Sequence, residues 1–110
     1  MVSDVLEKYV AALNSGDADR VAELFGEECS FVDGGARLLD YEDVVASGRE
    51  AVRKAFEGVF ASYKVGAEIV KLNPNSMEYD VTLEGAFIPC IGAATLDDKG
   101  LIKEYIVRPR

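Results

Sequence analysis

The spacing of apolar residues changes once along this 110-residue chain, and that change constrains the fold more than any other feature. Up to Tyr63 apolar residues recur every three or four positions, which is typical of helices with one buried face. After Tyr63 they alternate with polar residues, which is typical of strands. Helices therefore precede strands, apart from a short β-prone segment at residues 30–33. This block order predicts an α+β domain rather than alternating βαβ units.

Three helices are expected in the first half. Ser3 is a suitable N-cap for the first helix, which is predicted to end near Asn14. Asp17 can cap a short second helix, whose buried side is expected to reach Phe25. The third helix opens at residues 47–50, SGRE, which have the pattern of a capping box. Its apolar stripe consists of Val52, Ala55, Phe56, Val59 and Phe60.

Strands are predicted at residues 30–33, 65–69, 77–83, 91–96 and 101–107. Turn residues at 73–75, NPN, and at 97–100, DDKG, join the later strands into two hairpins. Residues 86–89 link the hairpins, and Pro89 suits an edge or the start of a strand. The irregular stretch at 34–46 is predicted to be a long loop with at most a short extended piece. Loops of this length often act as lids or binding loops.

Composition excludes several classes of function. Twenty acidic and twelve basic residues give a net charge of −8, which disfavours nucleic acid and anionic membranes as partners. The chain has no histidine, so acid–base chemistry must use carboxylates, tyrosines or lysines, and neither a metal nor a cofactor is expected. Cys29 and Cys90 are far apart and are expected to be buried and unpaired. No apolar stretch approaches membrane-spanning length, so we expect a soluble, cytoplasmic protein.

Residues 9–17, YVAALNSGD, followed by Val21, Leu24, Phe25 and residues 31–33, FVD, resemble the N-terminal third of bacterial ketosteroid isomerases. The SGRE motif and the closing hairpin follow in the same order. The chain is thus similar to the nuclear-transport-factor-like superfamily, which includes polyketide cyclases, dehydratases, epoxide hydrolases and non-catalytic binding modules. The resemblance implies a single domain over residues 1–110. In it, three N-terminal helices would pack on a curved, mainly antiparallel sheet and form a conical pocket, as in a cystatin-like roll.

Two of the catalytic positions of those isomerases are matched here. Tyr9 corresponds to the tyrosine that donates a hydrogen bond to the substrate oxygen, and Asp33 corresponds to the general base. The family's second acid, which donates to the same oxygen, falls at Gly92 when the closing hairpins are aligned through Gly100. Losing one of two such donors typically lowers a rate about 10²- to 10³-fold. Tyr79 and Tyr105 are candidates to replace it.

Each of these residues also has a purely structural interpretation. Phe31 and Asp33 lie on the same side of their strand, so an inward Phe31 implies an inward carboxylate whose pKa is raised by burial. Alternatively, Asp33 with the two glycines that follow it is simply a turn. Tyr9 can equally be a core residue. The residues expected to line the pocket, for which core packing is the other explanation, are Phe25, Phe56, Phe60, Val65, Tyr79, Val81, Phe87, Gly92 and Tyr105.

Three functions remain open at this stage. In an isomerase or cyclase, Asp33 would remove a proton next to a carbonyl while Tyr9 polarises the oxygen. In a hydrolase or dehydratase, Asp33 would activate water. The third alternative is a non-catalytic binding or dimerisation module. The expected ligand is a small hydrophobic molecule. The resemblance also implies a homodimer through the outer sheet face, for which Ile102 and Ile106 on one parity of the last strand are suited.

Overall fold

The computed structural model describes residues 1–110, which form three helices and one six-stranded sheet. The helices are α1 (Val2–Ser15), α2 (Ala18–Ala22) and α3 (Arg49–Ser62), with a short 3-10 helix, η1 (Gly35–Leu39). The strands are β1 (Phe25–Asp33), β2 (Val44–Ser47), β3 (Val65–Leu72), β4 (Ser76–Leu83), β5 (Ala86–Leu96) and β6 (Ile102–Pro109). The predicted α+β class is therefore confirmed. None of the helices is long and apolar enough to cross a membrane.

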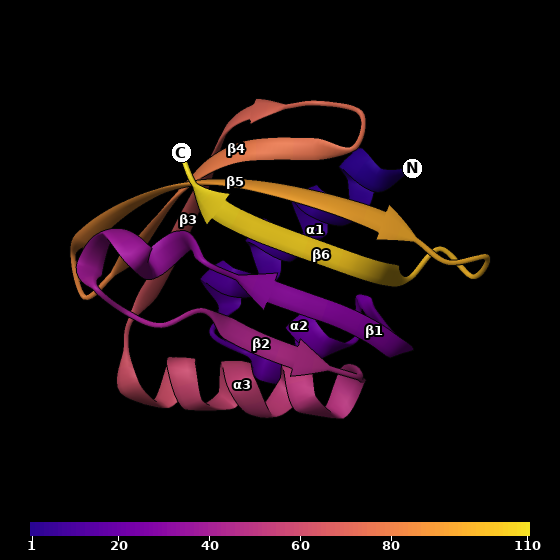
Figure 1. Cartoon of the computed structure of the whole chain (residues 1–110), viewed down its shortest axis with the longest axis horizontal. Helices are drawn as coiled ribbons and strands as arrows, with labels where there is room; N and C mark the ends of the chain where they lie inside the picture. Colours follow the sequence, from indigo (N-terminus) through magenta and orange to yellow (C-terminus); the bar gives the residue numbers. More distant parts are fainter.

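The strands lie in the order β2-β1-β6-β5-β4-β3, and every neighbouring pair is antiparallel except β1 and β6. The curved sheet has helices on one face only, with α1 and α2 behind it in the view of Figure 1 and α3 along the edge that β2 forms. Inward side chains from all the longer strands meet the apolar faces of α1 and α3 in one core. One sheet face is thus left without a helical cover.

An asparagine clip fixes α1 over the far edge of the sheet. The Asn14 amide donates to the carbonyl oxygen of Ala67 and accepts from the Ala67 N–H, at 2.8 Å in each case. Because β3 is an edge strand, these backbone groups would otherwise have no partner in the sheet. The clip and the buried face of α1 together hold Tyr9 above the inner face of the sheet.

Several predicted boundaries of the helices are wrong. Met1, and not Ser3, precedes α1 and makes no side-chain cap. Phe25 begins β1 instead of closing α2. The capping box does not form, because Ser47 ends β2 and Gly48 takes a positive φ of 91° at the helix start. Glu50, freed from any capping role, pairs with Arg53.

The middle loop and the strand that contains Pro89 also differ from expectation. Residues 34–46 include η1 and most of β2, which pairs with β1. Residues 86–96 form one strand, so Pro89 lies inside β5 rather than at its start. The carbonyl oxygen of Pro89 accepts from the backbone N–H of Arg110, which lies just past the end of β6. Because the N–H and C=O of one residue in a strand point to the same side, the N–H that proline lacks would also point to the end of β6, where no ladder hydrogen bond is lost.

The alternation of inward and outward side chains along β6 is interrupted once. Thr95 pairs with Glu104 but Leu96 pairs with Ile102, so a bulge at Lys103 interrupts the alternation. As a result Ile102 is fully buried, whereas Ile106 lies on the outer face. The expectation that both isoleucines face outward is therefore wrong for Ile102.

Candidate functional site

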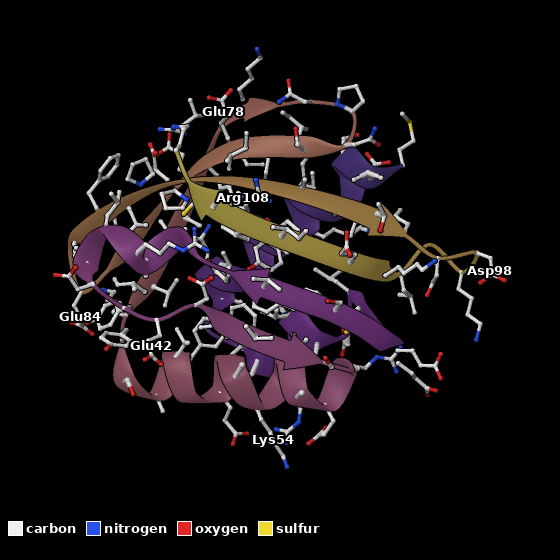
Figure 2. The ribbon with its side chains drawn as sticks, in the orientation of Figure 1. Glu42, Lys54, Glu78, Glu84, Asp98 and Arg108 are labelled. Atoms are coloured by element: carbon white, nitrogen blue, oxygen red, sulfur yellow. The ribbon has the colours of Figure 1, made fainter.

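A cavity of about 270 Å³ lies between the inner face of the sheet and the helices. Its deep walls carry fully buried rings, whereas its mouth carries exposed side chains from the segment between η1 and β2. The buried lining residues include Tyr9, Leu13, Phe31, Tyr79, Ile88 and Cys90, whereas Asp33, Tyr63 and Leu83 are half-buried and Tyr41 and Glu42 at the mouth are exposed. Glu42 lies at the same end of the molecule as Glu84 of the β4–β5 turn (Figure 2).

Tyr9 presents an unpaired hydroxyl to this cavity. Its ring is held by edge-to-face contacts with Phe25, Phe56, Tyr79 and Tyr105, and only 1% of the residue is exposed. The hydroxyl makes no hydrogen bond with the protein. Every side-chain oxygen that is inaccessible to solvent does have a hydrogen-bond partner, so the Tyr9 oxygen is not one of these inaccessible atoms. Its oxygen is therefore accessible from the cavity that Tyr9 lines. Burial holds the pKa of Tyr9 well above its ordinary value, so the phenol keeps its proton and acts as a donor.

Asp33 has both of the roles that the sequence left as alternatives, because it forms a turn and also lines the cavity. Its Oδ1 accepts the backbone N–H of Gly35 at 2.9 Å, which forms an Asx-turn at the start of η1. The residue also lines the cavity, and its second oxygen makes no hydrogen bond with the protein. Burial raises the pKa of Asp33, the Gly35 N–H opposes this, and the nearby charge of Asp43 adds to it. A carboxylate of raised pKa is a stronger base than one in water.

Tyr9 and Asp33 therefore face one cavity from opposite layers of the fold, the first from α1 and the second from the end of β1. The Asp33 charge contributes to the raised pKa of Tyr9, which places the two groups within electrostatic reach of each other. A carbonyl compound in this cavity could meet a hydrogen-bond donor and a base at the same time.

The raised pKa of Asp33 gives a testable pH dependence of stability. Between the ordinary value of 3.8 and the raised pKa, the folded chain binds more protons at this site than the unfolded chain. The contribution of Asp33 to the free energy of unfolding is therefore expected to fall as the pH rises through that window. Urea unfolding of the wild type and of Asp33→Asn, compared over a pH series, isolates this contribution. Parallel pH profiles for the two proteins would contradict it.

The other expected pocket residues divide into two groups. Phe56, Val65, Tyr79 and Val81 do line the cavity. Five others lie outside it, which corrects their expected position. Phe25 and Tyr105 are fully buried behind the lining, and Gly92 lies beneath the Tyr105 ring. Phe60 packs at the rim of the core beside α2. Phe87 is 59% exposed because it alternates with inward Ile88 on β5.

The mouth was not predicted residue by residue. Tyr41 belongs to the segment that is predicted to be a long loop, and the irregular pattern of that segment gives no inward direction. The Tyr63 hydroxyl donates to the Tyr41 hydroxyl at 3.2 Å, which connects that segment to the end of α3. Arg37 of η1 binds Asp43 through two hydrogen bonds of 2.8 and 2.6 Å and closes the same segment on itself.

Cys90 also lines the cavity, beside Asp33 and Gly35. Burial, with the charge of Asp33, raises the pKa of its thiol to about 12. The thiol is therefore protonated at neutral pH and is a poor nucleophile. No group of three or more cysteine, aspartate or glutamate side chains is arranged to hold a metal ion.

Comparison with known proteins identifies the relatives of this arrangement. Residues 6–105 match the family model of the SnoaL-like domain. A cystatin-fold protein from Novosphingobium aromaticivorans superposes with a TM-score of 0.76 at 16% identity, covering 96% of this chain and 95% of its own. An NTF2-like protein from Cytophaga hutchinsonii gives 0.74 at 19% identity, with 100% and 90% covered.

A third relative, from Catenulispora acidiphila, has a ketosteroid isomerase-like fold and was solved in complex with trimethylamine. It gives a TM-score of 0.76 at 16% identity, with 97% of this chain and 85% of that chain covered. At such identities the likeness to these three structures shows a shared fold. No curated protein matches the sequence.

Proposed function

Because this chain belongs to the SnoaL-like domain family, we propose that it is a small-molecule enzyme of the ketosteroid isomerase or polyketide cyclase type. One observation carries the proposal: the Asp33 carboxylate and the unpaired Tyr9 hydroxyl line the same apolar cavity. Asp33 is the general base, and Tyr9 stabilises the oxygen on which negative charge develops.

The proposed step begins with a substrate carbonyl near Tyr9. The free oxygen of Asp33 takes a proton from the carbon next to that carbonyl, and the electrons of the broken C–H bond form an enolate whose oxygen accepts from Tyr9. In an isomerase, protonated Asp33 then returns the proton to a different carbon. In a cyclase, the enolate carbon attacks a second carbonyl of the same molecule, the π electrons of that carbonyl move to its oxygen, and the resulting alkoxide takes the proton from Asp33. The Gly35 N–H holds the other oxygen and orients the carboxylate throughout.

The charges of the lining favour a substrate without negative charge. Asp33 and Glu42 contribute carboxylates, whereas no lysine or arginine lines the cavity. An anionic group would therefore enter without a counter-charge. The volume of about 270 Å³ is near the lower end of ligand pockets, which range from about 300 to 1,000 Å³. We therefore propose a small neutral ketone, or the reactive ring of a larger one that extends through the mouth.

The test of this function is proton transfer on simple ketones. A β,γ-unsaturated ketosteroid and the smaller 3-cyclohexenone report isomerisation by the appearance of conjugated-enone absorbance. Deuterium exchange next to the carbonyl of acetophenone, followed by NMR, reports enolisation even where no product rearranges. We expect catalysis of exchange above the buffer rate with at least one ketone. Exchange at the buffer rate with all of them would reject proton abstraction as the function.

A non-catalytic binding module is the second candidate, and the composition of the cavity supports it. Rings of Tyr9, Phe31, Phe56 and Tyr79 surround the Asp33 carboxylate, and such a combination suits a small cationic amine. The Catenulispora relative binds trimethylamine. Calorimetric titration with trimethylamine separates the two candidates, because binding without ketone exchange would favour this one.

We further propose a homodimer through the uncovered sheet face. Val45, Val32, Ile106 and Ala93 are register partners across four strands and form an apolar row that we call the outer-face patch. Val45 is 70% exposed. In the next row Glu78 and Arg108 flank Ile91, so a partner related by twofold symmetry could oppose their charges (Figure 2).

Replacing Val45 by glutamate is expected to convert this dimer into a monomer. A charge at this position of an apolar interface would be buried without a partner, which opposes association. Sedimentation velocity at micromolar concentration measures the change. Lys54→Glu, on the exposed side of α3, is the matched control and leaves the dimer intact (Figure 2). A monomeric wild-type protein would contradict the prediction.

A further inference from the structure

We propose that Tyr79 is the second hydrogen-bond donor of the site, and that Tyr105 positions it across Gly92. This inference rests on the proposed function, because it assigns the donor that would share the substrate oxygen with Tyr9. The three residues come from successive strands of the inner sheet face, Tyr79 from β4, Gly92 from β5 and Tyr105 from β6.

The first step concerns the direction of one hydrogen bond. The Tyr105 hydroxyl donates to the Tyr79 hydroxyl at 3.2 Å. Tyr105 is fully buried behind the lining and makes no other side-chain hydrogen bond, so its proton has this one acceptor. Tyr79 lines the cavity, and its own proton meets no acceptor in the protein. The Tyr79 O–H is therefore free to donate to a ligand.

The second step explains how residues on non-adjacent strands can touch. Along β5, Cys90 pairs with Tyr79 on β4, Ala94 pairs with Tyr105 on β6, and Gly92 lies between them. The Tyr105 ring crosses β5 over Gly92, where an added Cβ would collide with the Tyr105 hydroxyl and would lie 2.8 Å from two ring carbons. The missing side chain at residue 92 is thus the condition for the contact between the two tyrosines.

The third step places Tyr79 beside Tyr9, the first proposed donor. The ring centroids of Tyr9 and Tyr79 are 6.5 Å apart, and the ring planes are almost perpendicular. Both residues line the cavity together with Asp33. Burial holds the pKa values of both phenols well above the ordinary value, so each keeps its proton at neutral pH. Two phenols can then donate to one enolate oxygen, where the isomerases use one phenol and one acid. Tyr105 touches no substrate and is a positioning residue.

The experiment reads the hydrogen bonds on a bound carbonyl directly. Acetophenone labelled with ¹³C at its carbonyl serves as the probe, because each donated hydrogen bond lowers the stretching frequency of that bond. In Tyr79→Phe and in Tyr9→Phe we expect the carbonyl band of the complex to lie at a higher frequency than in the wild type, part of the way back toward that of the ketone without hydrogen bonds. Tyr105→Phe is expected to give a smaller movement in the same direction, with acetophenone still bound. A structural role alone would not move this band.

Exchange kinetics supply the second readout. Tyr79→Phe is expected to slow deuterium exchange about 10²-fold, as for removal of an oxyanion donor. Tyr105→Phe, which removes one neutral hydrogen bond behind the donor, is expected to slow it about 2- to 10-fold. Met77→Leu is the matched control, since Met77 is a buried residue of the same strand outside the cavity. It should leave both readouts unchanged.

The outcomes separate this inference from the proposed function. A carbonyl band and an exchange rate that change in Tyr9→Phe but not in Tyr79→Phe would overturn the role of Tyr79 and leave the proposed function standing. Absence of any bound ketone in the wild type would overturn both. Should Tyr79→Phe fail to fold, Tyr105→Phe decides: an unchanged band and rate in that variant would overturn the proposal.

Discussion

Replacing Asp33 by asparagine is expected to lower the rate of ketone deuterium exchange about 10²- to 10⁴-fold, the usual contribution of a general base. Asparagine keeps an oxygen that can accept the Gly35 N–H, so the Asx-turn and the shape of the cavity should persist. What disappears is the free carboxylate oxygen. In the wild type the exchange rate should rise with pH through the raised pKa of Asp33, because the ionised form is the base.

Asp97 offers a control of the same kind for this substitution. Its Oδ1 accepts the backbone N–H of Lys99 at 2.9 Å, so it forms an Asx-turn just as Asp33 does. It lies in the β5–β6 turn and does not line the cavity. Asp97→Asn should therefore keep the wild-type exchange rate. Equal rates for wild type and Asp33→Asn, with exchange still above the buffer rate, would remove Asp33 from the mechanism.

The fold was largely predictable because its main elements carry strong periodic signals. The apolar stripe of α3 and the alternation of β4 specify helix and strand without reference to the rest of the chain. The errors occur where distant contacts decide the local conformation. Phe25 begins a strand because it pairs with Ile102 on β6, a partner 77 positions away in the sequence. The bulge at Lys103, which turns Ile102 inward, has no local signature either.

The candidate site was predictable to a different extent. Tyr9 and Asp33 were found through a resemblance, and the structure gives both a place on one cavity. Parity alone indicated that Tyr79 faces inward, but it does not separate a lining residue from one behind the lining, such as Tyr105. Tyr41 was not identified, because the segment between η1 and β2 has no period from which a direction follows. Sheet curvature and inter-strand register decide which inward side chains line the cavity, and neither can be derived from the periodicity of a single sequence.

The register of β5 and β6 changes the interpretation of Gly92. In the sequence, Gly92 stands where the family has its second acid, so the acid side chain is missing. In the structure that space holds the Tyr105 ring, so a side chain at residue 92 would compete with a tyrosine rather than fill a gap. The substitution that would restore the family pattern should therefore damage this protein.

Gly92→Asp is accordingly expected to destabilise the fold by about 3 kcal/mol or more, and not to raise activity. Overpacking a core typically costs about 1 to 3 kcal/mol, and burying a carboxyl among apolar groups adds to that cost. Gly92→Ala, which adds only a Cβ, should also destabilise, although replacing glycine in a strand normally gains stability. Urea unfolding measures both variants. Gly58→Ala on α3 is the matched control, since nothing lies within 4 Å of the added atom. It should stabilise by about 0.4 to 1 kcal/mol.

A double-mutant cycle identifies the cause of the loss at residue 92. Tyr105→Leu removes the hydroxyl and the two ring carbons that an added Cβ would meet. If this contact is responsible, Gly92→Ala must cost clearly less in the Tyr105→Leu background than in the wild type. An equal cost in both backgrounds would show that the destabilisation arises elsewhere on β5. A Gly92→Ala protein as stable as the wild type would show that the Tyr105 ring can move aside, and with it the support that Tyr105 gives to Tyr79.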